Sequence, residues 1–327
     1  GESIAEELTN RLTKAKQLRV VVARSFELKR NDTPELTRLA KELQVATLLT
    51  GTVRKLGDKI RISVQLIDPR SNKYLWSETY EKPFNSLFTV EDDISRSVVG
   101  KLNVQRAGMQ MDTPSKQYTA SLEAYDLYLK GRFYWNKRTP EAMERAIQLF
   151  EQAVIADPKY ALAYSGLADS YSTLVDHESM PARKGMPLAK SAALKARELD
   201  DSLAEAHTSL GFISSVYDWD WASAEQSFKR AIELNPNYPT AHSWYARFLT
   251  HIGDMNGAIE EAKRAAAIDP LSLPVNSALG CYLYYARRFD ESQEQLQKTL
   301  DLDQSFSPAH FFLGRIFIRR GRFDSAL

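Results

Sequence analysis

The sequence predicts two kinds of fold in one chain: an α/β sandwich domain in residues 1–106 and an all-α solenoid of paired helices in residues 122–327. Before residue 106, apolar and polar residues alternate over short segments, which is typical of strands. After residue 122, apolar residues recur at helical spacing and the pattern breaks about every 34 residues, which indicates a repeat protein. The polar segment 107–121 is expected to be a linker.

The breaks in the second half consist of an acidic or amide residue followed by proline or a polar residue. Their second residues lie 43, 35, 34 and 34 positions apart, so the wider first interval predicts an insertion near residues 176–181. Proline and aspartate at these points end one helix and turn the chain into the next. The five breaks are Asp157-Pro158, Asp200-Asp201, Asn235-Pro236, Asp269-Pro270 and Asp303-Gln304.

Each break is followed ten residues later by a small residue, where two helices are expected to cross closely: Ala168, Gly211, Ala246, Gly280 and Gly314. Second helices carry small residues on one face, as in Ala258–Ala262–Ala265. This pattern resembles the tetratricopeptide family over about residues 122–327, with five repeats and a partial sixth. The resemblance implies a right-handed superhelix whose concave inner face binds a segment of another protein.

The first 106 residues predict the order α-β-α-β-β-β-α, which is one sheet covered by helices. The clearest strand has Ile60, Ile62, Val64 and Leu66 in strict alternation. The other expected elements are a helix from Ile4 to about Lys16, a strand Leu18–Ala23, a helix from Thr33 to Leu43, strands at Ala46–Val53 and Tyr74–Thr79, and a helix from Phe84 to Leu102.

Four segments of this domain resemble the TolB amino-terminal-like family, and they are Leu49–Arg54, Val64–Asp68, Leu75–Tyr80 and Leu87–Ile94. The repeat segments Glu123–Gly131 and Asp218–Trp221 also resemble repeats that follow such a domain. The family begins with an apolar strand ending in Pro-Phe, and that strand is absent here. We therefore expect an incomplete sandwich in a fragment of a longer protein. Members of this type lie downstream of a protein kinase, a nucleotide cyclase or a winged-helix DNA-binding domain.

Composition argues against several functional classes. The net charge is +1, with 19 Lys and Arg against 14 Asp and Glu in residues 1–110 and 24 against 28 in the remainder, so no nucleic-acid-binding surface is expected. The single cysteine, Cys281, rules out an internal disulfide framework. No apolar run approaches the roughly 20 residues of a membrane helix. Location stays open, cytoplasmic or periplasmic, because it depends on whether a membrane span lies upstream.

No catalytic, cofactor-binding or metal-binding residues are expected. The chain has neither a glycine-rich phosphate loop nor a Gly-x-Ser-x-Gly elbow. His207, His242 and His310 fall at one equivalent place in three repeats, which favours a packing role over metal binding. We expect Asp176–Glu178 to be a solvated loop, and Trp219 and Trp221 to anchor the core at a corner between helices. A direct enzymatic role is therefore disfavoured.

The family pattern implies a partner-binding groove lined by residues of the first helices. Three arginines there favour an acidic or carboxylate-bearing segment, and aromatic residues beside arginine are typical of binding hot spots. The alternative is an inner face that is merely solvated or filled by the protein's own chain. The expected groove residues are Tyr128, Arg132, Trp135, Asp169, Ser172, Thr208, Phe212, Arg247, Tyr284 and Arg315.

The sequence thus predicts a non-catalytic protein–protein interaction or scaffold module of a bacterial signalling protein. Two alternatives stay open. In the first alternative, the chain is the regulatory or sensory arm of a Ser/Thr kinase or nucleotide cyclase. In the second, it is the sensor arm of a membrane-anchored winged-helix transcription regulator. Both place the catalytic or DNA-binding domain upstream. The expected partner is a protein or peptide segment, with neither nucleic acid binding nor membrane insertion by this fragment.

Overall fold

The computed structural model describes residues 33–57, 59–71, 73–83, 87–103 and 118–325, with Leu8, Thr9, Leu12, Val20 and Val21. The chain forms two compact units, and the boundary between them lies between Leu122 and Glu123. Apart from those five residues, the expected first helix and the expected strand at 18–23 lie outside the described residues, as does most of the expected linker.

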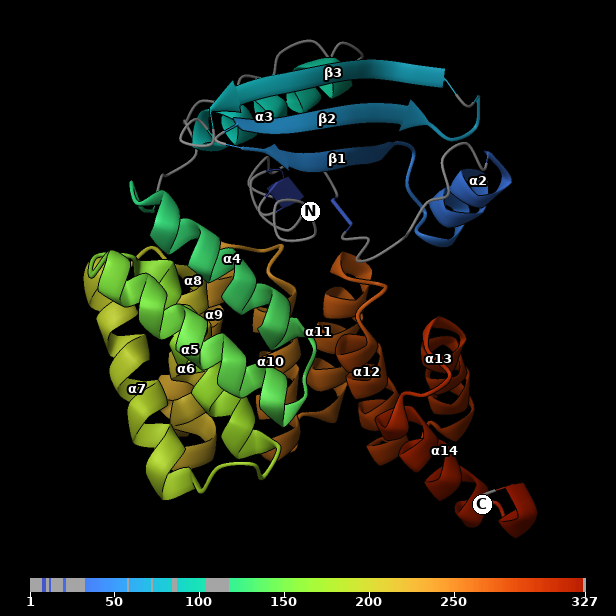
Figure 1. Ribbon diagram of the computed structural model, residues 1–327. Coiled ribbons are helices and arrows are strands. Elements are labelled where there is room, and N and C mark those ends of the chain that lie inside the picture. Colours follow the sequence, from blue (N-terminus) through green and yellow to red (C-terminus); the bar gives the residue numbers. More distant parts are fainter. Residues whose placement is uncertain are drawn as a thin grey trace. The chain divides into compact units, whose positions relative to one another are not determined.

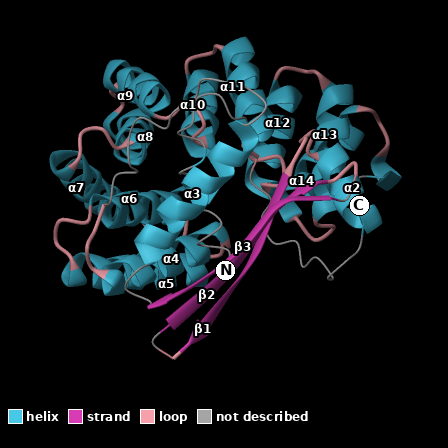
Figure 2. Cartoon of the chain, turned by 90° about the horizontal axis from the view of Figure 1, so that it is seen from above, coloured by secondary structure: helices cyan, strands magenta, loops and turns pink. Residues whose placement is uncertain are grey.

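The first unit contains a three-stranded antiparallel sheet in the order β1-β2-β3 (Figure 2, magenta). Its strands are β1 (Leu48–Leu56), β2 (Lys59–Asp68) and β3 (Lys73–Pro83). The predicted alternation on β2 is confirmed, because Ile60, Ile62, Val64 and Leu66 are all buried on one face. Burying every second side chain against a core is what fixes the register of such a strand.

Helices α2 (Thr33–Glu42) and α3 (Leu87–Asn103) belong to the same unit, and α3 packs on β2 and β3. Its buried stripe consists of Val90, Ile94 and Val98, which recur at spacings of four. The expected third strand is present and extends further than predicted, to Pro83, and on it Tyr74 is exposed while Tyr80 is buried. An irregularity in the β2–β3 pairing at Leu66/Ile67 shifts the register there. The described part is therefore a small sheet with helices.

The second unit is entirely helical, and its helices follow one another as hairpins from α4 to α14 (Figure 1). Five pairs are followed by α14 and a short 3₁₀ turn at Phe323–Ser325. The first helices of the pairs are α4 (Leu122–Asn136), α6 (Ala161–Asp176), α8 (Ala204–Ile213), α10 (Pro239–His251), α12 (Leu273–Tyr285) and α14 (Ser307–Arg319). The second helices are α5 (Pro140–Ala156), α7 (Ala182–Leu199), α9 (Trp221–Leu234), α11 (Met255–Ile268) and α13 (Phe289–Leu302).

Small residues allow these helices to approach closely. A Cβ added at Gly131 on α4 or at Gly166 on α6 would lie 2.5 or 2.6 Å from Cε1 of Phe150, so one ring fills the space beside both helices. A Cβ at Gly280 would lie 2.6 Å from Cδ2 of Leu296 on α13. The predicted crossing at Gly280 is confirmed, because no larger residue fits there without displacing its partner.

The equivalent histidines have a structural role in addition to packing. Nε2 of His242 lies 2.9 Å from the carbonyl oxygen of Pro236, six residues earlier in the turn between repeats. Asn276 donates from Nδ2 to the carbonyl of Pro270 at 2.8 Å in the same way. His207 and His310 face the corresponding carbonyls. The repeated position therefore joins four of the inter-repeat turns to the helix that follows each of them.

One corner departs from the regular repeat. Helix α8 continues as a π-helical turn at Ser214–Asp218, and Trp219 then takes a left-handed backbone conformation with φ of 57°. Trp219 is 72% exposed and Trp221 is also exposed, so the expected core anchors are wrong. The left-handed turn directs the chain towards solvent before Asp220 caps α9, and Ala224 is the first buried residue of α9. π-turns and strained residues of this kind concentrate at functional positions.

Candidate partner-binding face

Six residues occupy one position on the six first helices, directly after the small residue at each helix crossing. Consecutive first helices from α6 to α14 contact each other, which places these residues along one side of the solenoid. We call this set the inner column. It consists of Arg132, Asp169, Phe212, Arg247, Cys281 and Arg315.

The beginning of the inner column is a buried ion pair. Nη1 of Arg132 lies 3.5 Å from Oδ2 of Asp169, and the hydroxyl of Ser209 donates to Oδ1 of the same carboxylate at 2.6 Å. These three residues come from α4, α6 and α8, so one carboxylate connects three successive first helices. Both members of the ion pair are buried. Such a pair is costly to break, because either charge alone would remain desolvated.

Burial raises the pKa of Asp169 to about 6, while Arg132 and the hydrogen bond from Ser209 act in the opposite direction. Burial also raises the pKa of Tyr238 strongly, and the nearby Asp169 carboxylate adds to that effect. The beginning of the inner column is thus a region of low dielectric in which a carboxylate titrates near neutral pH.

Aromatic rings fill the space around this ion pair. The guanidinium carbons of Arg132 and Arg138 lie 4.4 and 3.6 Å from the centre of the Trp135 ring, which is buried. Tyr128 packs against Phe150 and Tyr160, with ring centres 5.8 and 5.2 Å apart. The expected groove residues of these first repeats therefore lie inside the structure.

The middle of the inner column holds a second internal ion pair. Nη1 of Arg247 on α10 lies 2.6 Å from Oδ1 of Asp176 at the end of α6, and the guanidinium also lies over Phe212 at 5.3 Å. Phe212 in turn contacts Trp244 with ring centres 4.6 Å apart. The charge of Arg247 is therefore neutralised within the solenoid.

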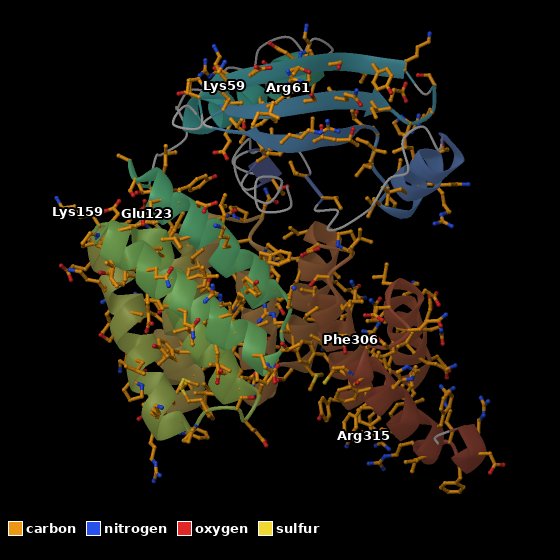
Figure 3. The ribbon with its side chains drawn as sticks, viewed as in Figure 1. Lys59, Arg61, Glu123, Lys159, Phe306 and Arg315 are labelled. Carbon is orange, nitrogen blue, oxygen red and sulfur yellow. The ribbon has the colours of Figure 1, made fainter. Side chains whose placement is uncertain are left out.

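The end of the inner column combines an arginine with aromatic rings, of which Tyr284 is buried. The guanidinium carbon of Arg315 lies 4.9, 5.5 and 5.9 Å from the ring centres of Tyr284, Phe311 and Phe312. Tyr285 is 51% exposed and Phe311 is 60% exposed. Figure 3 shows the Arg315 side chain extending from α14. In the part of the chain that the structure describes, Arg315 has no carboxylate partner.

The ten expected groove residues are therefore not equivalent. Arg247 and Arg315 are half-buried, and the other eight are buried. Phe311, Tyr285 and Arg319 were not predicted. Phe311 lies four residues before the inner-column residue of its helix, Arg315. Tyr128 and Thr208 have the same position relative to the inner-column residues of their own helices, so the repeat spacing could have predicted Phe311. A hydrogen bond from Arg319 lowers the pKa of Tyr284, which places Arg319 beside the same rings.

The remaining residue of the inner column, Cys281, is unreactive. Burial raises the pKa of the Cys281 thiol to about 12, against the influence of Arg315 and Arg247. A thiol that stays protonated is a poor nucleophile and a poor metal ligand. Within the described ranges, no cluster of three His, Cys, Asp or Glu side chains could hold a metal ion. Over the same residues, no helix is long and apolar enough to cross a bilayer.

Comparison with known proteins agrees with this geometry. Two family models described as tetratricopeptide repeat match residues 219–279 and 277–327. The chain contains tetratricopeptide repeats. The solved structure of a monomeric mutant of IFIT1 with Gppp-AAAA shares the fold, with a TM-score of 0.55 and 16% identity over 74% of this chain and 56% of that one. Tetratricopeptide proteins bind peptides or proteins, and the fold is generally non-catalytic.

Two curated bacterial relatives are longer than this chain. "Putative adenylate cyclase 3" of Rhizobium meliloti (strain 1021) is 27% identical over 216 residues, which cover 66% of this chain and 37% of the relative. "Transcriptional regulator HilA" of Salmonella typhimurium is 25% identical over 185 residues, which cover 57% of this chain and 33% of the relative. The matched region thus amounts to about a third of the length of either relative.

Proposed function

We propose that this chain is a non-catalytic interaction module of a bacterial signalling protein, which binds a partner segment on the inner face of its repeats. The observation that carries the proposal is the continuous face made by the first helices, which contact one another in succession from α6 to α14. On this face the guanidinium of Arg315 lies together with the rings of Tyr284, Phe311 and Phe312. Aromatic residues next to arginine account for much of the binding energy at protein interfaces.

We further propose that the first unit is an incomplete TolB amino-terminal-like domain of the α/β sandwich class. The four segments that carry the resemblance fall on β1, β2, β3 and the first part of α3, in the order that the resemblance requires. The proposed domain limits are residues 1–106, a linker at 107–121 and repeats from 122. The unit boundary after Leu122 supports the last of these limits.

Two larger roles are compatible with this module. The match to "Putative adenylate cyclase 3" supports a regulatory arm of a nucleotide cyclase, or by extension of a kinase. The match to "Transcriptional regulator HilA" supports the sensor arm of a transcription regulator. The relatives extend well beyond the matched region, so either role assigns the catalytic or DNA-binding activity to sequence outside this chain.

Site-specific photocrosslinking tests the interaction proposal directly. A benzoylphenylalanine introduced in place of Phe311 should crosslink a discrete partner protein in bacterial lysate, identified by mass spectrometry. The matched control replaces Ile155, a 78% exposed apolar residue on the second helix α5. A partner captured at Ile155 but never at Phe311 would contradict an inner-face interface.

A further inference from the structure

We propose that the outer side of the second and third repeats binds peripherally to the surface of an anionic lipid bilayer. The contacting groups are Trp219 and Trp221 in the turn between α8 and α9, together with the basic outer face of α7. We call residues 218–221 the tryptophan corner. This inference goes beyond the proposed function, because it assigns a second surface, made by second helices, and a partner of another class.

The tryptophan corner is exposed although the repeats on both sides of it are described. Helices α6 and α7 precede it, α10 and α11 follow it, and α8 contacts α7, α9 and α10. Trp219 is nevertheless 72% exposed, and Trp221 is exposed as well. Large apolar groups that stay in solvent in this way mark surfaces that meet a partner.

The backbone conformation of Trp219 is one that favours glycine. Glycine takes a left-handed conformation at little cost, as Gly253 does at the equivalent corner of the next repeat, whereas tryptophan is strained there. Neither packing nor backbone geometry therefore accounts for a tryptophan at this position, and such departures concentrate at functional sites. Four helix pairs have a left-handed residue directly before the N-cap of the second helix, namely Arg138, Trp219, Gly253 and Arg287, with φ between 57° and 85°.

Helix α7 surrounds the tryptophan corner with positive charge. Nζ of Lys190 lies 2.8 Å from Oδ2 of Asp218, so the middle of α7 lies directly beside the corner. Arg183 and Arg197 are seven residues away in either direction, which places them on the same face at about 10 Å along the helix axis. The helix has five basic residues and one acidic residue. Within the described residues, Arg183, Lys184 and Arg197 have no carboxylate partner.

The two aspartates of the corner are already engaged. Asp218 pairs with Lys190, and Asp220 accepts a hydrogen bond from the backbone N–H of Ser223 as the N-cap of α9. The unpaired charges on this side of the repeats are therefore the basic residues of α7. They would be attracted to an anionic surface within about a Debye length, roughly 10 Å at moderate salt.

Exposed leucines complete the character of this face. Leu188 and Leu194 of α7 are exposed among the basic side chains. Tryptophan, leucine and unpaired Lys or Arg together are typical of surfaces that lie in an anionic membrane interface. First helices contact one another along the inner column, so the side chains of α7 and the corner project from the outer side. A fluid bilayer surface adapts to projecting side chains, which favours lipid over a peptide segment.

Partitioning into vesicles tests the proposal with the whole chain. Vesicles of phosphatidylcholine with about 30% phosphatidylglycerol are compared with phosphatidylcholine alone. The chain should bind the anionic vesicles at least about tenfold more tightly, and raising salt from about 50 to 300 mM should weaken that binding. Lipids brominated in their acyl chains should quench tryptophan fluorescence, because an interfacial indole ring lies close to those chains.

Trp219→Gly removes the ring without disturbing the corner. Glycine adopts the left-handed conformation freely, so the melting temperature should stay at or above that of wild type. The affinity for anionic vesicles should nevertheless fall at least about tenfold, and quenching by brominated lipid should decrease. Arg183→Gln, Lys184→Gln and Arg197→Gln should each weaken binding by about fivefold.

The matched control is Ile155→Ala on α5. Ile155 is an exposed apolar residue of another second helix, which has three glutamates and one arginine. Its replacement should leave the affinity for anionic vesicles within about twofold of wild type. Circular dichroism of each variant would confirm that the helices remain folded.

Equal binding to both kinds of vesicle would overturn the anionic bilayer, as would unchanged affinity and quenching in Trp219→Gly. If vesicles fail to bind and benzoylphenylalanine at position 219 crosslinks a protein, the corner docks a protein and the lipid proposal is wrong. Neither result bears on the inner face, which crosslinking from position 311 tests separately.

Discussion

At the residue scale, four of the turns between repeats are each joined to the next helix by one side chain. Nδ1 of His242 lies 2.6 Å from Oε2 of Glu261, while its Nε2 faces the carbonyl of Pro236. The next repeat has the neutral equivalent, in which Gln295 donates to Oδ1 of Asn276 at 2.7 Å. The same geometry is thus built from an ionisable pair in one repeat and from two amides in the next. Asn276 and Gln295 each lie 34 residues after their equivalents, His242 and Glu261.

Replacing His242 with leucine should destabilise the repeats by about 1–3 kcal/mol, because Glu261 and a turn carbonyl would lose buried partners. Urea unfolding measures the effect. The double variant His242→Asn with Glu261→Gln copies the Asn276–Gln295 pair and should remain close to wild type. An equal loss of stability in the leucine and double variants would show that the hydrogen bonds contribute little.

The buried Asp169 should make folding stability depend on pH. Its folded pKa of about 6 lies above the ordinary value of 3.8, so the folded state binds the proton more tightly than the unfolded state does. The resulting stabilisation is fully present below about pH 4 and is lost as pH rises through 6, with a limit of about 3 kcal/mol. Arg132, Arg138, Glu205 and Tyr238 are the other charged or titratable groups near it.

Unfolding free energies of wild type and Asp169→Asn between pH 4 and 7 would show this contribution. The difference between the two proteins should favour wild type increasingly as pH falls, since asparagine cannot take up the proton. A constant difference across this range would mean that Asp169 has an ordinary pKa.

At the element scale, the helix crossings allow little variation. Gly280→Leu should lower the free energy of unfolding by about 1–3 kcal/mol, because the new side chain must displace Leu296. Gly100→Leu is the matched control, since a Cβ at that helical position meets nothing within 4 Å. Thermal unfolding compares them, and a raised melting temperature for Gly280→Leu would contradict the crossing.

Elements with a strong periodic pattern could be predicted from the sequence. Helices α4 to α14 and the alternation on β2 follow from apolar spacing, and the glycine crossings follow from the repeat register. The π-turn before Trp219 and the irregular pairing at Leu66/Ile67 could not be predicted, because each is a local backbone adjustment to tertiary packing. The exposure of Trp219 depends on that turn.

For the candidate site, the sequence predicts which residues belong to the inner column but not which of them have partners inside the protein. Repeat register places Arg132, Arg247 and Arg315 at equivalent positions. Whether each arginine has an internal partner depends on contacts between different repeats. Arg247 and its partner Asp176, for example, lie 71 positions apart in sequence. Sequence spacing alone cannot separate a buried arginine from one available to a ligand.

At the scale of the whole repeat unit, Arg247 and Asp176 connect the second and fourth repeats. A double-mutant cycle with Arg247→Gln and Asp176→Asn should give a coupling of about 0.5–1 kcal/mol, since both side chains are partly exposed. High salt should reduce the coupling. Additive single effects would show that the contact is energetically neutral.

The stability of a simple repeat array is a sum of terms for single repeats and adjacent pairs, so unfolding can spread from either end one repeat at a time. The contact between Asp176 and Arg247 adds a term between repeats that are not adjacent. Helices α6 to α10 should then open as one cooperative block, visible as a common hydrogen-exchange rate, while α12 to α14 exchange independently and sooner. Helices α12 to α14 would thus be the part of the described array that can reorganise without unfolding the rest.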